Sequence, residues 1–233
     1  MPTERPPAEG QGDDLALLGL LQLVSPALPI GAFAWSQGLE STFELGWVGS
    51  EAELGEWLAG VLDDGLTYCE LPLIKRQMLA WRRGDGEALS GWDAWLAATR
   101  ETAELAAEDS QLGASLKRLM ASLDLLPDTP AIPPGAGYVT VFAALAVGRG
   151  VDTRSAMLGF AWSWLENQLS AACKALPLGH TAAQRLIECL RPALSRAVER
   201  AWTLEDDELG PVLPGLALAS ALHETQYSRL FRS

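Results

Sequence analysis

The chain has 233 residues and is acidic, with 17 lysines and arginines against 30 aspartates and glutamates and a net charge of −13. An apolar share of 48% with only 20% charged residues excludes disorder of the whole chain and indicates a sizeable core. The negative charge argues against nucleic acid as a partner, because lysine and arginine drive phosphate binding, and it suits basic protein partners.

The cysteines and the hydropathy pattern indicate the cellular compartment of the protein. The three cysteines, Cys69, Cys173 and Cys189, include no CxxC pair and indicate small buried residues in a reducing environment rather than a disulfide framework. The apolar run 15–24 does not predict a signal peptide, because four acidic residues and a single arginine precede it. No run reaches the roughly 18 apolar residues of a membrane span. We therefore expect a cytoplasmic protein.

The N-terminal residues divide into a tail and a first helix. Residues 1–12 are rich in proline, glycine and glutamate, and we expect them to be disordered, with 13–233 forming one all-helical domain. Asp13 and Asp14 can cap a first helix that ends near Val24, since carboxylates suit the positive end of a helix.

Proline and glycine interrupt the pattern next. The segment 25–31 contains Pro26, Pro29 and Gly31, and it predicts a rigid connector between helices, with a contact surface as the alternative. A second short helix is expected over about 34–45.

Three further helical segments precede the clearest internal loop. Ser50 and Glu53 form a capping box that opens one helix. Another is expected over about 73–83, and a long helical region over roughly 87–123. The loop 127–137, rich in proline and glycine, marks either a domain boundary or a crossover within one bundle. We favour the crossover, because neither half shows a self-sufficient pattern.

The remaining chain also predicts helices. Residues 138–142 are rich in strand formers, but no partner strand is apparent, so we expect a buried helix. The segment 153–176 is apolar on two sides, which is typical of the centre of a bundle. A helix over about 181–202 should be kinked at Pro192, and a last helix covers about 215–228. Together these patterns predict an all-α, single-domain bundle of roughly nine or ten helices.

The sequence shows no catalytic constellation. It has no GxxxxGK[ST] phosphate loop and no nucleophile elbow. His223 and Glu224 begin like a zinc-protease HExxH motif, but Tyr227 stands where the second histidine would be. The alternative to a non-catalytic protein is a stand-alone metal carrier or enzyme that uses His180, His223 and the cysteines.

The end of the chain contrasts with its acidic composition. The last six residues contain Arg229 and Arg232 with no acidic side chain, and Leu230 and Phe231 lie between them. Such alternation at a free end can anchor in a groove of a partner, with apolar contacts and arginine–carboxylate pairs. The alternative is that Leu230 and Phe231 fold back onto their own domain.

Two other groups of residues are open to the same two interpretations. On the last predicted helix, His223, Gln226 and Tyr227 share one polar and aromatic face. Gln184 and Arg185 lie near the start of the helix expected over 181–202. Each group can bond to the core of the chain itself or to a partner.

The segment 223–233 (HETQYSRLFRS) resembles the C-terminal signature of the UreF family of urease accessory proteins. A second match covers 25–40 (SPALPIGAFAWSQGLE), and a third covers 178–186 (LGHTAAQRL). The three matches occur in order and span almost the whole chain. Two positions depart from the family: His180 stands where glutamine is usual, and Gly137 precedes a tyrosine where histidine is usual.

The resemblance implies a scaffold or chaperone without enzymatic activity or cofactor. In that family the protein binds the accessory protein UreD, also called UreH, and recruits the GTPase UreG to apo-urease for nickel insertion. It is thought to regulate GTP hydrolysis by UreG, and it often forms a symmetric homodimer. The residues to which the resemblance and the patterns above assign partner binding are His223, Glu224, Gln226, Tyr227, Arg229, Leu230, Phe231, Arg232, Gln184 and Arg185.

Overall fold

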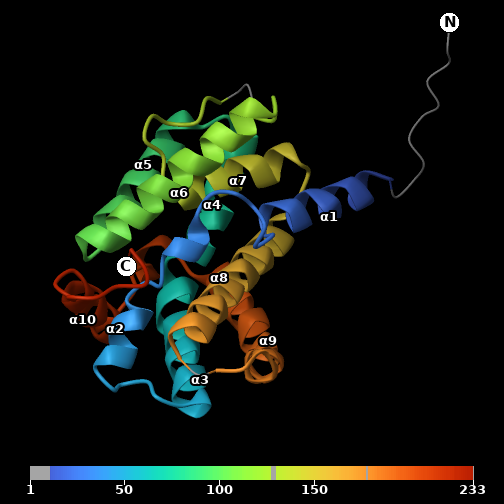
Figure 1. The fold of residues 1–233 in the computed structure, drawn as a ribbon. Coiled ribbons are helices and arrows are strands. Elements are labelled where there is room, and N and C mark those ends of the chain that lie inside the picture. The colour runs from blue at the N-terminus through green and yellow to red at the C-terminus, as the bar shows by residue number, and fades with distance from the viewer. Residues whose placement is uncertain (1–10, 127–129, 177, 233) are drawn as a thin grey trace, which may run out of the picture.

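The regular secondary structure of the protein is helical over the residues that the computed structural model describes, which are 11–126, 130–176 and 178–232 (Figure 1). These ranges contain no strand, and the buried apolar side chains form one continuous core. The prediction of an all-α, single-domain bundle is therefore confirmed. The disorder expected for 1–12 concerns residues that lie mostly outside the described ranges, and residues 11 and 12 belong to the first helix.

The α-helices follow one another in chain order, and short helical turns join some of them. Their bounds are α1 (Gln11–Leu23), α2 (Leu39–Glu44), α3 (Glu51–Gly60), α4 (Glu70–Arg83), α5 (Gly86–Ala98), α6 (Ala103–Ser122), α7 (Tyr138–Gly148), α8 (Thr153–Ala175), α9 (His180–Thr203) and α10 (Pro214–His223). The turns are η1 (Ala32–Ala34), η2 (Val61–Gly65), η3 (Leu66–Tyr68) and η4 (Asp206–Glu208).

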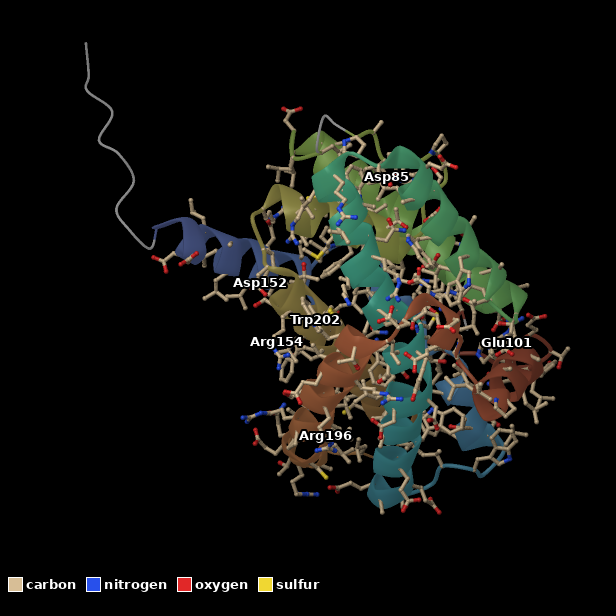
Figure 2. The ribbon with its side chains drawn as sticks, turned by 180° about the vertical axis from the view of Figure 1, so that it is seen from behind. Asp85, Glu101, Asp152, Arg154, Arg196 and Trp202 are labelled. Atoms are coloured by element: carbon tan, nitrogen blue, oxygen red, sulfur yellow. The ribbon has the colours of Figure 1, made fainter. Side chains whose placement is uncertain are left out.

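Side-chain caps fix where several helices begin. Ser50 accepts the N–H of Glu53 and so caps the start of α3, as the sequence predicted, and the Glu53 carboxylate accepts the Ser50 hydroxyl. Asp85 caps α5 by accepting the N–H of Ala88, and Asp152 caps α8 by accepting the N–H of Ser155; Figure 2 shows both at their helix ends.

Three of the expected helices differ from the observed ones in their bounds. The region 87–123 forms two helices, because Thr102 leaves the helical conformation and caps α6 through its hydroxyl; Glu101 marks this break in Figure 2. The second helix starts at Leu39 rather than near residue 34, since Gln37 and Gly38 adopt positive φ angles of 55° and 76°. The last helix ends at His223, after which the chain turns back onto the body.

The core centres on α4, α7 and α8. Helix α7 packs against α4 and α6 and is buried over most of its length, so the buried helix expected over 138–142 is confirmed. The rings of Tyr138, Phe142 and Phe160 join α7 to α8, with the Phe142 and Phe160 centroids 5.3 Å apart. Helix α9 continues through Pro192. None of the described helices has both the length and the apolarity needed to cross a membrane.

Two features at the periphery of the bundle are helix α1 and the contact between α2 and α10. Helix α1 projects away from the bundle (Figure 1), and among its residues 12–23 only Leu20 and Leu23 are buried. Helix α2 packs against α10, where the Ser41 hydroxyl donates to the Ala219 carbonyl at 2.7 Å. Gly38 permits this approach, because a Cβ there would lie 2.8 Å from the backbone nitrogen of Ser220.

Candidate partner-binding surface at the C-terminus

The Glu40 carboxylate on α2 holds the chain that follows α10. It is buried, and it accepts the backbone N–H groups of Leu230 at 2.7 Å and Phe231 at 3.0 Å. It also accepts the side-chain amide of Gln226 at 3.3 Å and lies 3.1 Å from Nε2 of His223. One carboxylate thus gathers four polar groups that lie more than 180 residues away in sequence.

His223 connects this carboxylate to a second one. Its side chain is fully buried, with Nε2 facing Glu40 and Nδ1 lying 2.8 Å from Glu104 on α6. A neutral ring could donate to only one of these groups, whereas an imidazolium donates to both. Glu104 also accepts Nη1 of Arg229 at 2.8 Å, so His223 and Arg229 both tie the C-terminus to α6.

The last described residues contact the chain's own domain. Phe231 is only 6% exposed and belongs to the core cluster. Arg232 donates its backbone N–H to the Ala34 carbonyl at 2.8 Å and a guanidinium N–H to Gln111 at 3.0 Å. Its guanidinium also lies 5.9 Å from the ring centroid of Trp35. The two arginines and Phe231 are therefore engaged within the chain itself, and Ser233 lies outside the described residues.

Two apolar side chains of the same stretch face solvent. Tyr227 is fully exposed and Leu230 is 68% exposed, and Leu218 and Leu222 of α10 are exposed nearby in sequence. The neighbouring Glu224 accepts the Ala103 N–H at 3.1 Å and anchors the start of the turn. The stretch 223–232, here called the C-terminal segment, thus consists of anchored residues that hold its backbone and of exposed residues that the anchors present to solvent.

Comparison with known proteins decides the family. Residues 48–191 match the family model of UreF. The chain belongs to the UreF family. It is 69% identical over 223 residues to the urease accessory protein UreF of Chromohalobacter salexigens, covering 96% of this chain and 97% of that protein. The UreF proteins of Marinobacter nauticus and Hahella chejuensis are 67% and 45% identical, covering 95% and 94% of this chain and 96% and 99% of their own lengths.

The first and last of the three UreF-like motifs meet in space. The match at 25–40 ends on Glu40, the residue that holds the C-terminal segment, so the first and last motifs form one surface. Sequence reasoning did not assign Glu40 or Glu104 a role, although a glutamate inside a matched motif was a usable signal. At Gly137, where the family usually has histidine, a Cβ would crowd the carboxylate of Asp109.

The third UreF-like motif lies elsewhere. Gln184 and Arg185 are exposed on α9, which lies across the bundle from α10 in Figure 1. Arg185 forms a two-pronged ion pair with Glu51 of α3, with N–O distances of 2.6 and 2.9 Å. Because both side chains are exposed, this pair adds little to stability. Figure 2 shows Arg196 of the same helix on the rear face of the molecule.

The groups of the alternative metal-carrier interpretation are not assembled into a site. Among the described residues, no three histidine, cysteine, aspartate or glutamate side chains are grouped so that they could hold a metal ion. The carboxylates beside His223 lie at opposite ring nitrogens and do not converge on one point. Cys69 is buried, which raises the pKa of its thiol, whereas Cys189 and His180 are exposed and Cys173 is half-buried.

Proposed function

We propose that this UreF-family chain is a cytoplasmic, non-enzymatic scaffold of urease maturation. With a UreD/UreH-type protein it recruits a UreG-type GTPase to apo-urease for nickel insertion and regulates GTP hydrolysis by that GTPase. The observation that carries the proposal is the C-terminal segment, whose backbone is held by Glu40 while Tyr227 and Leu230 remain exposed. Relatives that align along nearly the whole chain are named urease accessory proteins, which supports the same conclusion.

The anchored backbone suits the C-terminal segment to bind the UreD/UreH-type partner. A segment whose backbone is already ordered loses less conformational entropy on binding. Exposed aromatic and aliphatic side chains at such a position are typical binding hot spots. Truncation of a hot-spot residue costs about 2 kcal/mol or more of binding free energy. Gln184 and Arg185 on α9 form a second proposed contact surface, separate from the C-terminal segment.

Helix α1 provides the surface that we assign to a homodimer. Leu15, Leu17, Leu18 and Leu21 are each more than half exposed. A contiguous apolar face of this kind is typical of a protein interface. Together with the dimers of the family, it favours a second copy of the chain as the occupant.

Charge placed on this face should separate the copies. We expect the double substitution Leu18→Lys and Leu21→Lys to convert a dimer into a monomer in sedimentation velocity, without lowering the melting temperature. Leu125→Lys, at an exposed leucine beyond α6, is the matched control and should leave the dimer intact. A wild-type chain that sediments as a monomer at micromolar concentration would contradict the assignment.

The experiment that tests the main proposal is recovery of the native complex. The tagged chain is co-produced with urease subunits and UreD/UreH- and UreG-type proteins, and the bound proteins are identified by mass. We expect all these partners in one complex, with no turnover of GTP or urea by the isolated chain and no tight stoichiometric nickel. Hydrolysis that tracks the concentration of the purified chain, or one tightly bound nickel per chain, would instead favour the carrier or enzyme alternative.

A further inference from the structure

A cavity of about 180 Å³ lies between the connector after α1, the middle of α6 and α8. Its walls are largely apolar and include Leu28, Phe33, Leu112, Phe160 and Trp164. Phe33 is largely exposed. A cavity of roughly 150 Å³ in a protein core admits benzene, so this one has room for a ligand of similar or slightly larger size.

The charged residues that line the cavity are strongly unbalanced. They comprise the four acidic residues Glu70, Glu108, Asp109 and Glu166, and the single basic residue Arg100. Arg100 is already paired, with N–O distances of 2.6 Å to Glu70 and 3.4 Å to Asp109. Once Glu108 is ionised, the four acidic groups against one basic group give the lining an excess of negative charge, which favours a cationic occupant and disfavours an anion.

Glu108 is a buried acidic residue of this lining. It is 6% exposed, and it accepts the side-chain amide of Gln37 at 3.1 Å. Burial raises its pKa to about 8, so that the carboxyl group is mostly protonated at neutral pH. A buried acid kept neutral beside a cavity is a frequent property of binding sites.

Gln37 connects Glu108 to the wall of the cavity formed by α8. This non-glycine residue has a φ angle of 55°, which costs free energy and persists only where the surroundings fix it. Its side-chain oxygen accepts Nε1 of Trp164 at 2.9 Å, while its amide donates to Glu108. Gln37 thus links α8 to α6 across the cavity lining.

We propose that this cavity binds an organic cation with an apolar body, such as an aryl or alkyl amidinium, guanidinium or ammonium ion. The apolar walls would take the body, and the acidic residues would neutralise the charge. The same chemistry can be supplied by a free small molecule or by an arginine side chain of a partner. This proposal does not depend on the role in urease maturation.

Proton linkage gives the proposal a direct signature. A cation pairs better with ionised than with neutral Glu108, so binding should release a proton and become tighter as the pH rises through about 8. The groups whose charges act on Glu108 are Arg100, which favours its ionisation, and Asp109 and Glu70, which oppose it. Tyr138 also lines the cavity, but burial and the charge of Glu108 raise its pKa, so it stays neutral over the tested range.

Benzamidine is a suitable probe, because it combines an aromatic ring with an amidinium that stays charged between pH 6 and 9. Calorimetric titration of the full chain should show benzamidine binding at least tenfold tighter at pH 9 than at pH 6. Neutral benzamide and anionic benzoate, which have nearly the same shape, should bind at least tenfold more weakly at pH 9. Absence of benzamidine binding, or equal binding of the three probes, would overturn the proposal.

Substitution at Glu108 locates the effect. Glu108→Gln should weaken benzamidine binding at pH 9 about tenfold and abolish its pH dependence, whereas Glu87→Gln on the exposed face of α5 should change neither. An unchanged pH dependence in Glu108→Gln would overturn the assignment to this cavity. If that variant does not fold, the comparison of the three probes on the natural chain still decides the question.

The source of the cation is distinguished by a competition experiment. Capture of the UreD/UreH-type partner is measured with and without saturating benzamidine. Lower capture would assign the cation to a side chain of the partner, whereas unchanged capture together with benzamidine binding would assign it to a free small molecule.

Discussion

At the scale of single residues, the C-terminal segment depends on one buried carboxylate. Glu40 accepts two backbone N–H groups, one side-chain amide and a contact from the His223 ring. Such a carboxylate cannot be replaced by its amide without loss, because an amide presents donors of its own to the same groups. We infer that Glu40 positions the residues proposed to bind the partner.

The substitution Glu40→Gln tests this role. It preserves the size of the side chain but leaves buried donors of Leu230, Phe231 or His223 unpaired, so we expect the free energy of unfolding to fall by about 1–3 kcal/mol. Glu44→Gln, at an exposed position of the same helix, is the matched control and should stay within about 0.5 kcal/mol of the natural chain. Urea denaturation measures both, and equal stabilities of the two variants would exclude the anchoring role.

Glu108 predicts a pH dependence of stability with a definite sign. Its pKa is about 8 in the folded chain against an ordinary value of 4.5. Between these values the folded chain binds more protons than the unfolded chain, so this group lowers the free energy of unfolding as pH rises. Glu108→Gln lacks this cost, and its stability relative to the natural chain should increase from pH 5 to 8 and level off above.

Urea denaturation at several pH values measures this difference. We expect it to change by up to about 1.4 kcal/mol per pH unit within that window, with Glu87→Gln showing no such trend. A stability difference that is constant from pH 5 to 8 would mean that Glu108 is ionised in the folded chain.

At the scale of elements, close helix packing depends on glycine. Gly113 lies where α6 meets the start of α7, and a Cβ there would lie 2.7 Å from the backbone carbon of Gly137. Backbone atoms cannot move aside as the end of a flexible side chain can. The contact between α6 and α7 therefore requires glycine at this position.

An alanine pair measures the effect. Gly113→Ala should lower the free energy of unfolding by about 1–3 kcal/mol through overpacking. Gly91→Ala, within α5 and with open space around it, should instead raise the free energy by up to about 1 kcal/mol through helix propensity. Thermal unfolding of both variants checks the prediction, and a stabilised Gly113→Ala would show that α6 and α7 are less closely packed than described.

Local sequence signals predicted most helices but not how they meet. Capping residues such as Ser50 act within one turn, so they could be found without knowledge of the fold. The early end of α10 depends on distant residues, because Glu40 takes the N–H groups that follow it. For the same reason the sequence left the placement of Leu230 and Phe231 open. In the structure Phe231 is buried and Leu230 is exposed.

At the scale of the whole molecule, the C-terminal segment combines a stabilising role in the fold with the proposed partner binding, and a truncation would remove both. Phe231, Arg229 and Arg232 stabilise the chain's own fold, so deletion of 227–233 should lower both the melting temperature and partner capture. Point substitutions at the exposed residues separate the two effects. Leu125 provides a control, since it is also exposed. It follows the end of α6, whereas the C-terminal segment contacts the start of that helix.

The most direct test of the proposed function compares two variants for affinity to the UreD/UreH-type partner and for melting temperature. The double substitution Tyr227→Ala and Leu230→Ala should weaken binding by at least a hundredfold, about 2.7 kcal/mol, because two exposed apolar side chains are lost at the proposed interface. Its melting temperature should stay within about 2 °C of the natural chain, and Leu125→Ala should change neither quantity. Unchanged partner affinity in the double variant would contradict the proposed role of the C-terminal segment.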